Sequence, residues 1–346
     1  WSSTGTGVFN NSSILNPVYT PSITDITNGV LVLTLTATGN ATCPPVSDQM
    51  TIIINHNVFI SAGPDTTICQ GILFTVYGAS SVNEDSLLWT SNGTGTLTGE
   101  NTLNPTYTPA LNETGDINLV LTGFAFAPCV NVSDTMVLHI NPAVSVYAGM
   151  NDTICEGSTF PITDATAGSN IGLLWTTIGT GTFSDSSILN PVYTPGPDDI
   201  TNGFVNLVLT AYATVPCADQ SDTLTLFITR SPIAFAGPDT TICQNSVFTV
   251  TLASALFADS VNWISNGAGI LTNENTITPT YTPAVAESGD VALILYAFGS
   301  FPCGTASDTM FIHLSPVTSV FTGDNDTICE GSTFPITDAT AGSNIG

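Results

Sequence analysis

The chain has 346 residues and a strongly acidic composition, with 27 Asp and Glu residues against a single basic residue, Arg230. The resulting net charge of −26 excludes nucleic-acid binding, which needs clustered lysine and arginine to neutralise phosphates. No apolar run approaches the ~18 residues that cross a bilayer, so we expect a soluble globular chain with no membrane insertion in this segment. The acidic surface favours solubility and mutual repulsion, and it also removes cleavage sites for lysine-directed proteases.

The chain contains an internal repeat. Residues 151–172 recur letter for letter as residues 325–346. Four tryptophans mark a finer period of 86 or 88 residues, so two unequal kinds of unit alternate: Trp1, Trp89, Trp175 and Trp263. Because units of this length approach the ~100 residues of a small β-sandwich, we expect each one to bury its own core. The chain begins and stops inside repeats, so the absence of a visible signal peptide says nothing about export.

The repeats share a fixed order of strand signals, illustrated by residues 57–142. Short runs rich in Val, Ile, Leu, Thr, Phe and Tyr are bounded by Gly, Pro, Asn or Asp. They cover residues 58–63, 64–71, 72–79, 87–98, 104–109, 117–126 and 133–140. Segments such as 30–36 alternate aliphatic and polar residues, as strands with one buried face do. Apolar residues do not recur at the 3.6-residue spacing typical of a helix. About seven strands per unit indicate an immunoglobulin-like sandwich, with strands A to G in chain order.

These signals predict an all-β fold, a tandem array of immunoglobulin-like β-sandwich domains forming a rod. The expected complete domains are residues 57–142, 143–230 and 231–316. The expected partial domains are residues 1–56, with strands C to G, and residues 317–346, with strands A and B. The very short linkers between domains favour a stiff array over a flexible tether.

Recurring aromatic residues are expected in the cores of the domains. The tryptophans fall on strand C, where a large aromatic residue packs against the opposite sheet, which predicts core positions for Trp1, Trp89, Trp175 and Trp263. A tyrosine recurs in each (N/T)PxYTP segment, where prolines indicate an edge strand or a strand that switches sheets. We interpret this tyrosine as a packing anchor: Tyr19, Tyr107, Tyr193 and Tyr281.

The cysteines occur in pairs that are each 26 residues apart: Cys43 and Cys69, Cys129 and Cys155, Cys217 and Cys243, and Cys303 and Cys329. The chain has no CxxC spacing for zinc or redox chemistry, so structural disulfides in an oxidising, extracellular setting are expected. Cys69 is placed at the turn between strands A and B, at one end of its domain. Cys129 follows strand F at the other end, about eight strand residues away, beyond the ~7 Å Cα–Cα reach of a disulfide.

This topology predicts disulfides at the junctions between domains. In a head-to-tail array, the F–G end of one domain meets the A–B end of its predecessor, which pairs Cys69 with Cys217 and Cys155 with Cys303. The remaining cysteines, Cys43, Cys129, Cys243 and Cys329, would then pair with neighbouring repeats. A bridge within each domain stays open as the alternative, because a strand assignment that is wrong by one strand would reverse the argument.

The repeated run AGPDTTIC(Q/E)G, the strand-C Trp, NPxYTP and the Cys…SDTM segment resemble the PKD-like and immunoglobulin-like repeats of giant cell-surface adhesins of gliding and related Bacteroidota. The resemblance covers essentially the whole chain, although the WDFGDG signature of typical PKD repeats is lacking. It implies a secreted adhesin or filament, exported by a type IX system and displayed on the bacterial cell surface. The implied partners are adjacent repeats of the same array, surface polysaccharide or other cells.

A recurring Asp-(Ser/Thr)-apolar or Asp-(Ser/Thr)-Thr motif has two interpretations. Asp and Thr commonly begin strands and terminate turns by bonding local backbone. The motif also resembles the O-glycosylation signal of Bacteroidota, which implies sugars on the middle hydroxyl: Thr66, Ser86, Thr135, Thr153, Thr223, Thr240, Ser260, Thr309 and Thr327. Glycans there would shield exposed strand edges from aggregation.

No cofactor or catalytic site is expected. Acidic pairs such as Asp324 with Asp326 and Asp198 with Asp199 are weak candidate Ca²⁺ ligands, because EF-hand spacing is absent and solvated turn carboxylates are the favoured explanation. The histidines share a place near the end of strand G without a repeated nucleophile around them, so they indicate no catalytic site: His56, His139 and His313.

Two classes of function follow from the repeats. The first is a structural or adhesive segment of a giant extracellular repeat protein, without enzymatic activity. The alternative is a filament subunit that polymerises head to tail, with residues 317–346 completing the sandwich of residues 1–56 in the next molecule by strand donation. Carbohydrate binding has no supporting signature, because no exposed aromatic platform can be distinguished from core aromatics.

Overall fold

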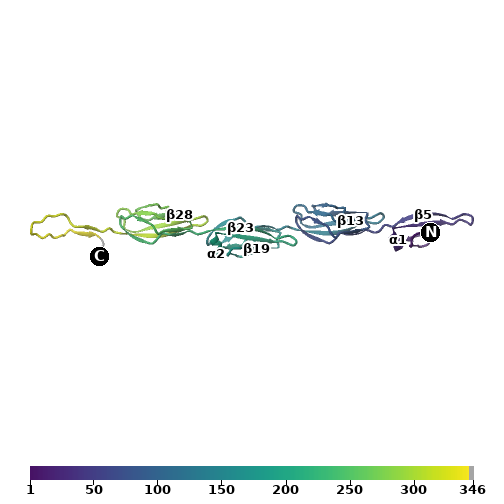
Figure 1. Ribbon diagram of the computed structural model, residues 1–346, viewed down its shortest axis with the longest axis horizontal. Helices are drawn as coiled ribbons and strands as arrows, with labels where there is room; N and C mark the ends of the chain where they lie inside the picture. The colour runs from purple at the N-terminus through teal and green to yellow at the C-terminus, as the bar shows by residue number, and fades with distance from the viewer. Residues whose placement is uncertain (343–346) are drawn as a thin grey trace. The chain divides into compact units, whose positions relative to one another are not determined.

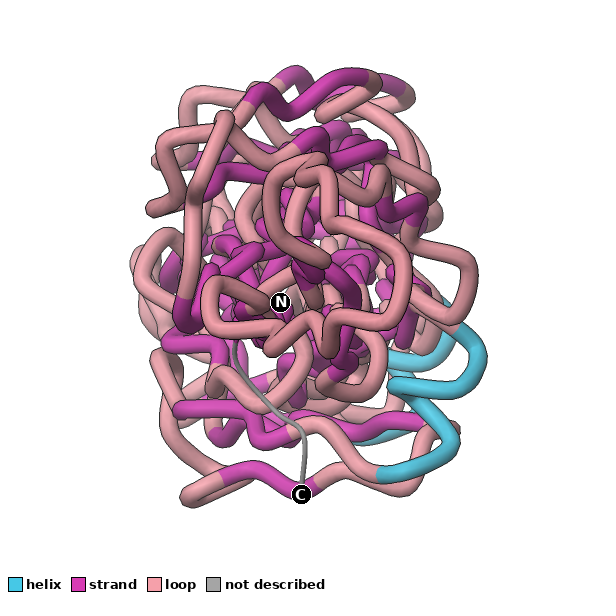
Figure 2. Tube along the Cα trace, turned by 90° about the vertical axis from the view of Figure 1, so that its left-hand side faces the viewer, coloured by secondary structure: helices cyan, strands magenta, loops and turns pink. Residues whose placement is uncertain are grey.

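A computed structural model describes residues 1–342 (Figure 1). Nearly all regular structure is β-strand, and helix is confined to two short segments (Figure 2). The chain forms two compact bodies. The first contains residues 1–145 with the short segments 168–172 and 211–220, and the second contains residues 146–167, 173–210 and the described residues from 221 onward.

The first body contains the sandwich of residues 57–142. Its strands are β6 (Phe59–Ser61), β7 (Thr66–Cys69), β8 (Phe74–Thr75), β9 (Ser80–Val82), β10 (Ser86–Ser91), β11 (Thr96–Thr98), β12 (Thr106–Thr108), β13 (Gly115–Phe124) and β14 (Val132–Asn141). One sheet has the order β10-β13-β14-β7, in which β7 lies parallel to β14. The second sheet has the order β11-β12-β8, and β6 pairs with β9.

Alternation along the long strands creates this core. On β13, Ile117, Leu119 and Leu121 are buried while the residues between them face outward, as the period of two requires. They pack with Trp89 and Tyr107, which are almost completely buried. The three complete repeats each have such a cluster, so each buries its own core.

The first body also contains residues 1–56. Their elements are β1 (Ser2–Ser3), β2 (Val8–Phe9), β3 (Tyr19–Thr20), α1 (Ile23–Asn28), β4 (Val30–Ala37) and β5 (Val46–Ile53), in sheets of order β1-β4-β5 and β2-β3. Strand β5 has no parallel partner of the kind that β7 provides to β14. Trp1 lines an open groove and is only half-buried, in contrast to the core position predicted for it.

The second body contains most of residues 143–230 and all of 231–316. The elements of the former are β15 (Ser145–Tyr147), β16 (Asp152–Cys155), β17 (Phe160–Pro161), β18 (Thr166–Gly168), β19 (Gly172–Thr177), β20 (Thr182–Phe183), β21 (Val192–Thr194), α2 (Pro197–Asn202), β22 (Phe204–Tyr212) and β23 (Gln220–Thr229). The four-stranded sheet has the order β16-β23-β22-β19, with β16 parallel to β23, and the three-stranded sheet has the order β17-β21-β20.

Residues 231–316 repeat this arrangement. Their strands are β24 (Ile233–Phe235), β25 (Thr240–Cys243), β26 (Phe248–Thr249), β27 (Ser254–Leu256), β28 (Ala258–Ser265), β29 (Ile270–Thr272), β30 (Thr280–Thr282), β31 (Gly289–Gly299) and β32 (Thr305–Ser315). The sheets have the orders β25-β32-β31-β28 and β26-β30-β29. Beyond them, β33 (Ser319–Phe321) pairs with β34 (Thr340–Gly342); the expected partial domain extends over residues 343–346, which lie outside the described residues.

A four-stranded sheet facing a three-stranded sheet in each complete repeat is the immunoglobulin-like sandwich, so the predicted all-β tandem fold is confirmed. The strand count differs from the prediction, because each complete repeat has nine short strand segments. Cys69, predicted at a turn, instead ends strand β7, because the end of β14 provides residues 66–69 with a parallel partner.

Two six-residue helices were not predicted. Helix α1 begins after the N-cap Ser22, whose hydroxyl accepts a hydrogen bond from Asp25 N, and its C-cap is Gly29, in the left-handed region with φ of 71°. Helix α2 begins at Pro197 and its C-cap is Gly203, with φ of 77°. A helix this short has no hydrophobic period to detect, and only its capping residues indicate it.

Candidate functional site: the disulfide-linked junctions

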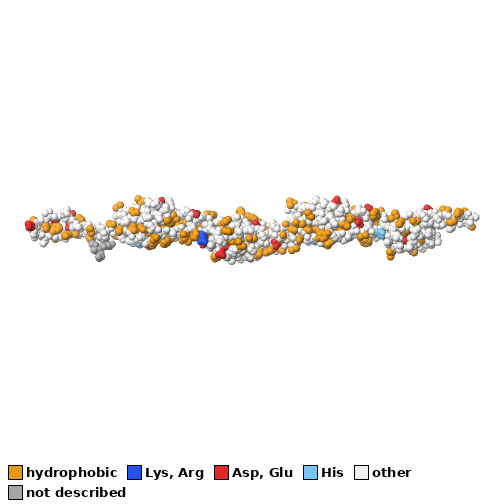
Figure 3. All heavy atoms as spheres, viewed as in Figure 1, with side chains coloured by type: hydrophobic (Ala, Val, Ile, Leu, Met, Phe, Trp, Pro, Cys, Tyr) orange, Lys and Arg blue, Asp and Glu red, His pale blue; other side chains and the backbone are white. Residues whose placement is uncertain are grey.

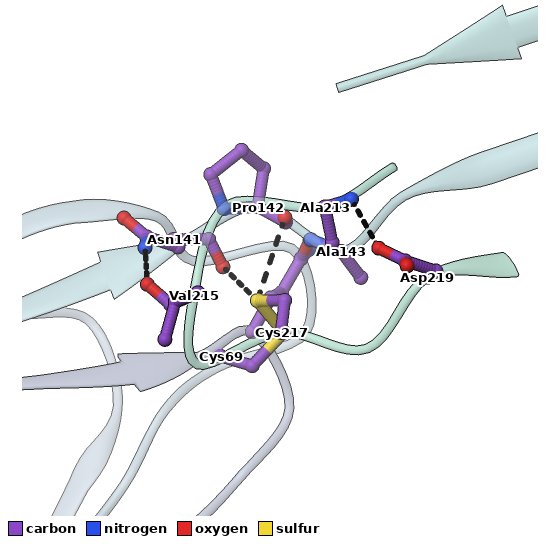
Figure 4. Close-up of a disulfide and its surroundings, with 9 residues drawn as sticks. Cys69, Asn141, Pro142, Ala143, Ala213, Val215, Cys217 and Asp219 are labelled. Carbon is purple, nitrogen blue, oxygen red and sulfur yellow. Dashed lines mark hydrogen bonds between the residues drawn. A yellow bond between two sulfur atoms is a disulfide. The ribbon is translucent and has the colours of Figure 1, made fainter. Parts of the chain in front are cut away.

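A disulfide joins Cys69 at the end of β7 to Cys217 in the loop between β22 and β23 (Figure 4). The Cα atoms are 5.1 Å apart, and the bridge closes a sequence separation of 148 residues. Cys217 Sγ lies 3.7 Å from Asn141 O and 3.8 Å from Pro142 O. The bridge therefore packs directly against the residues at which one repeat passes into the next.

Hydrogen bonds surround this bridge. The Asn141 side-chain amide donates to Val215 O at 3.0 Å, and Ala143 N donates to Gln70 Oε1 at 3.0 Å. Asn141 O in turn accepts a hydrogen bond from Gln70 N at 2.8 Å. Each side of the bridge is thus held to the backbone between the repeats by polar contacts as well as by the sulfurs.

The second disulfide joins Cys155 to Cys303, with a Cα–Cα distance of 5.0 Å and the same separation of 148 residues. The Ser231 hydroxyl lies 3.2 Å from Cys155 Sγ, and Cys303 Sγ lies 3.3 Å from Thr229 O. The next residue, Arg230, places its guanidinium 5.0 Å from the centre of the Phe257 ring, a cation–π contact. The basic residue of this acidic chain therefore lies at the junction.

Strand pairing explains why the bridges do not form within a repeat. Cys69 pairs with Asn141, the last residue of β14, whereas Cys129 precedes the first residue of that strand. Ten strand residues at about 3.3 Å each separate the two cysteines, far more than a disulfide spans. The predicted partners Cys69 with Cys217 and Cys155 with Cys303 are the partners present in the structure, and the alternative bridge within each domain is not formed.

Four cysteines carry free thiols: Cys43, Cys129, Cys243 and Cys329. Cys129 lies in surroundings like those of the bridged Cys217. Its Sγ is 3.6 Å from Asn55 O, and the Asn55 side-chain amide donates to Ala127 O at 2.8 Å, as Asn141 does to Val215. Cys243 ends β25 and pairs with Ser315, as Cys69 pairs with Asn141. These two thiols occupy the places that bridged cysteines have in the adjacent repeats.

A polar cluster that we did not predict lies beside the core of each repeat. In residues 57–142, the Tyr107 hydroxyl donates to the Glu113 carboxylate at 2.9 Å. Thr94 N and Ala110 N donate to the same carboxylate at 2.6 and 2.9 Å, and Gly95 N donates to the tyrosine oxygen at 3.0 Å. Burial raises the pKa of Glu113, but the hydrogen bonds from Ala110, Thr94 and Tyr107 together outweigh it and lower that pKa.

Residues 143–230 build the cluster from a different acid. Asp199, in the first turn of α2, is buried and accepts hydrogen bonds from Tyr193 OH at 2.7 Å and Gly196 N at 2.8 Å. Thr180 N and Gly181 N each donate to it at 3.1 Å. A sequence signal existed, because each tyrosine is followed six residues later by the acid of its cluster: Asp25, Glu113, Asp199 and Glu287.

The aspartates of the Asp-Ser/Thr motifs bond backbone at the sandwich edges. Asp134 accepts from Ala62 N at 2.8 Å, and Asp65 accepts from Val137 N at 2.8 Å. The hydroxyl residues that follow divide into two groups. Six are exposed, namely Ser86, Thr135, Thr223, Ser260, Thr309 and Thr327, whereas Thr66, Thr153 and Thr240 are half-buried.

The candidate calcium ligands do not form a cluster. Over residues 1–342, no group of three or more His, Cys, Asp or Glu side chains is arranged to hold a metal ion. Asp326 accepts from Thr327 N, Asp324 N donates to Asp338, and Asp199 is fully engaged in its polar cluster. Acidic side chains are also scattered over the face shown in Figure 3 and do not gather in one patch.

Two of the histidines form cross-strand pairs, while His56 is exposed. His139 Nδ1 lies 2.6 Å from Asp116 Oδ1, and His313 Nδ1 lies 2.6 Å from Asp290 Oδ1. The hydrogen bond with Asp290 raises the pKa of His313. In the described part of the chain, no helix combines the length and hydropathy needed to cross a membrane.

Comparison with solved structures finds tandem arrays of immunoglobulin domains at low similarity. No protein-family model and no curated protein matches it. The titin I-band fragment I67-I69 is 12% identical, with 75% of this chain and 99% of that chain covered and a TM-score of 0.47. The N-terminal eight immunoglobulin domains of Down Syndrome Cell Adhesion Molecule are 13% identical, with 83% and 40% covered and a TM-score of 0.48. Because both scores are below 0.5, the fold assignment here depends on strand order and pairing.

Proposed function

We propose that this chain is a structural and adhesive segment of a giant extracellular repeat protein, a surface stalk or filament of covalently linked sandwiches without catalytic activity. The observation that supports it is the pairing of the disulfides, which connect successive repeats and not the two sheets of one sandwich. Bridges of that kind resist separation of neighbouring domains. Disulfides also persist in oxidising compartments, which supports an extracellular location.

The proposal extends to the unbridged cysteines and to the domain boundaries. Cys129 and Cys43 would pair with repeats that precede this segment, and Cys243 and Cys329 with repeats that follow it. The domains would be residues 57–142, 143–230 and 231–316, with 1–56 and 317–346 as parts of further sandwiches of the same array. The resemblance to Bacteroidota adhesins supports display on a bacterial surface after type IX export, with polysaccharide or other cells as partners.

Two measurements on the native protein test this function. Boiling in SDS with reductant should leave a band far above the 35.8 kDa of this segment, and an antibody against residues 143–230 should label intact cells. A band that collapses to 35.8 kDa would instead support a separate subunit. Labelling that requires cell lysis would contradict the surface location.

The exposed hydroxyls of the Asp-Ser/Thr motifs are the proposed O-glycosylation sites. Thr135, Thr223 and Thr309 are exposed on the last strands of the three complete repeats, where a sugar fits without disturbing the core. The half-buried Thr66, Thr153 and Thr240 leave less room for one. Intact-mass measurement of protein from its own organism tests this, and a mass equal to the bare chain would reject it.

A second candidate function is a subunit that polymerises by strand donation, and a complementary pair of apolar surfaces favours it. Residues 1–56 contain an open groove of about 360 Å³ lined by Trp1, Phe9, Leu15, Asn16, Pro17, Tyr19, Leu33 and Met50. At the other end, Phe334 and Ile336 are exposed. Their counterparts Phe160 and Ile162, in a stretch of identical sequence, are buried in the core of residues 143–230.

Sedimentation velocity of the purified chain tests strand donation. We expect polymers that Ile336→Asp dissociates, because that charge would enter the apolar groove of the next molecule. Thr333→Asp is the matched control, since its counterpart Thr159 is exposed in the complete repeat. A chain that stays monomeric at high concentration, or that responds equally to both substitutions, would exclude this candidate.

A further inference from the structure

The spacing of the cysteines divides the chain into two kinds of segment. Each 26-residue interval contains the last strand of one repeat and the first strands of the next, and we call these four intervals struts: 43–69, 129–155, 217–243 and 303–329. Strut 129–155, for example, contains β14, β15 and β16. The segments between struts, 69–129, 155–217 and 243–303, contain the remaining strands of each repeat and its buried tryptophan.

The two disulfides join the struts end to end. Cys69 ends one strut and Cys217 begins another, so strut 43–69 continues covalently into strut 217–243. Cys155 ends a strut and Cys303 begins one, so strut 129–155 continues into strut 303–329. The bonded chain therefore contains two covalent tracks, and the segments that build most of each core lie outside both tracks.

The struts can be extended only a little beyond their folded length. Strands already make up most of strut 129–155, and a strand rises about 3.3 Å per residue, close to the limit of about 3.3–3.6 Å for a fully stretched chain. Both tracks run from one end of a repeat such as 143–230 to its other end. One track contributes residues 143–155 and the other contributes residues 217–230. Those pieces would limit the distance between its two ends even if its core were completely unfolded.

We infer that the disulfides make the chain a tether of nearly fixed length, in which single repeats unfold under tension without lengthening the molecule. The shortest covalent path past residues 57–142 is residues 57–69 and the Cys69–Cys217 bridge. The shortest path past residues 231–316 is the Cys155–Cys303 bridge and residues 303–316. The two ends of each complete repeat are thus connected by only about 12 residues of chain and a bridge. Without the bridges, unfolding of a repeat would add more than 80 residues to the extended chain.

The bridged and unbridged chains differ in their fully extended length between residues 57 and 316. With all three complete repeats unfolded and both bridges closed, the path from residue 57 to 316 runs through 57–69, 217–155 and 303–316. It contains about 87 residues, or roughly 30 nm at ~3.5 Å per residue. The same interval without bridges contains about 259 residues, or roughly 90 nm. The terminal segments add the same length to both forms.

Single-molecule stretching of the full chain, held by tags at its two ends, measures these lengths directly. In the oxidised chain, the first two complete repeats to unfold, in whichever order, should cause almost no increase in length. The third should cause one late extension of about 20 nm. After reduction, three extensions of roughly 25 nm each are expected, because every repeat then unfolds along its whole chain. Three such extensions in the oxidised chain would overturn the inference.

Substitution of the bridges one at a time gives a second, non-additive signature. Cys217→Ser or Cys303→Ser alone leaves one bridge, and the path from 57 to 316 grows only to about 111 residues, roughly 39 nm. The double variant should reach the full ~90 nm, so almost all of the lengthening appears with the second substitution. Cys129→Ser is the matched control, since that thiol is free, and it should change no length.

These lengths do not depend on how stable each variant is, because contour length counts residues and not unfolding forces. Additive lengthening by the two single substitutions would contradict the two-track topology. The inference deepens the proposed function, which requires an array that holds its length under load. The stretching result would nevertheless stand if the surface location failed, and surface labelling would stand if the stretching result failed.

Discussion

Residues 57–142 and 231–316 form one kind of repeat, and residues 143–230 form another, on the same strand order. The first kind anchors its core tyrosine to a glutamate in a turn, Glu113 or Glu287, and that glutamate is half-exposed. The second kind uses Asp199 in the first turn of α2, where the side chain is buried. An aspartate is one methylene shorter than a glutamate, and in this repeat it lies in the first turn of a helix instead of in a turn.

The difference shows that the carboxylate position is required and the surrounding backbone is adaptable. In both kinds, one acid accepts hydrogen bonds from a tyrosine hydroxyl and from backbone N–H groups of two separate turns. The acid therefore fixes those turns to each other and to the core. What changes between the two kinds is how much water reaches the acid, and this sets the order of the effects expected below.

Removal of the buried acid should have the largest effect. Asp199→Ala leaves Tyr193 OH and the backbone N–H groups of Thr180, Gly181 and Gly196 without their acceptor in a buried site. We expect a loss of about 3–5 kcal/mol for this repeat, against about 2–3 kcal/mol for Glu113→Ala, where water replaces part of the interaction.

Hydrogen exchange of the full chain, followed by mass spectrometry, separates the two repeats. Faster exchange should be confined to peptides of residues 173–210 in the first variant and of residues 86–124 in the second. Equal effects of the two substitutions would show that burial of the acid does not decide its contribution.

The glycines of the turn that faces the acid should have the next largest effect. A Cβ at Gly93 would collide with the Tyr107 hydroxyl and lie 2.7 Å from Glu113 Oε1, so Gly93→Ala must displace the cluster. We expect a loss of about 1–3 kcal/mol, measured as a lower midpoint of thermal unfolding. Gly115→Ala is the control: nothing lies within 4 Å of its Cβ, and only its φ of +93° costs about 1 kcal/mol.

The sequence allowed the sandwich class, three of the four predicted core tryptophans and the two bridges to be predicted, because alternation and spacing are local signals; the fourth tryptophan, Trp1, is only half-buried. Shorter elements depend on their partners. Residues 152–155 and 160–161 form β16 and β17, whereas the identical residues 326–329 and 334–335 form no strand, since no equivalents of β23 and β21 lie beside them. No propensity could distinguish the two copies.

The polar cluster escaped prediction for a different reason. Its members are a tyrosine, an acid six residues later and a glycine pair that precedes the tyrosine by more than ten residues, and each alone has an ordinary explanation in a turn or core. Only the folded sandwich brings the two turns together. Comparison of the four repeats for a constant spacing between tyrosine and acid would have indicated the pair.

Acid should weaken the repeats that use glutamate over a defined range of pH. The folded pKa of Glu113 and of Glu287 lies below the ordinary value of 4.5, so their stabilisation is complete above that value and is lost as pH falls through the folded pKa. Glu113→Gln should therefore remove part of the fall in stability of residues 57–142 between about pH 5 and pH 3. Denaturant unfolding across that range measures it, and an unchanged slope would contradict this role of Glu113.

The smallest effect is expected at the exposed His313–Asp290 pair, which the second kind of repeat replaces with phenylalanines at the corresponding positions 227 and 204. The folded pKa of His313 is raised above 6.5 by its hydrogen bond with Asp290. Its stabilisation is thus complete below the unfolded value and lost as pH rises through the folded one. In Asp290→Asn, the NMR titration of the His313 ring should return toward 6.5, with little change in unfolding temperature because water and salt screen an exposed pair. A titration that did not move would show that the short Nδ1–Oδ1 contact is not maintained in solution, and the exchange of this pair for phenylalanines would then not remove an ion pair from the second kind of repeat.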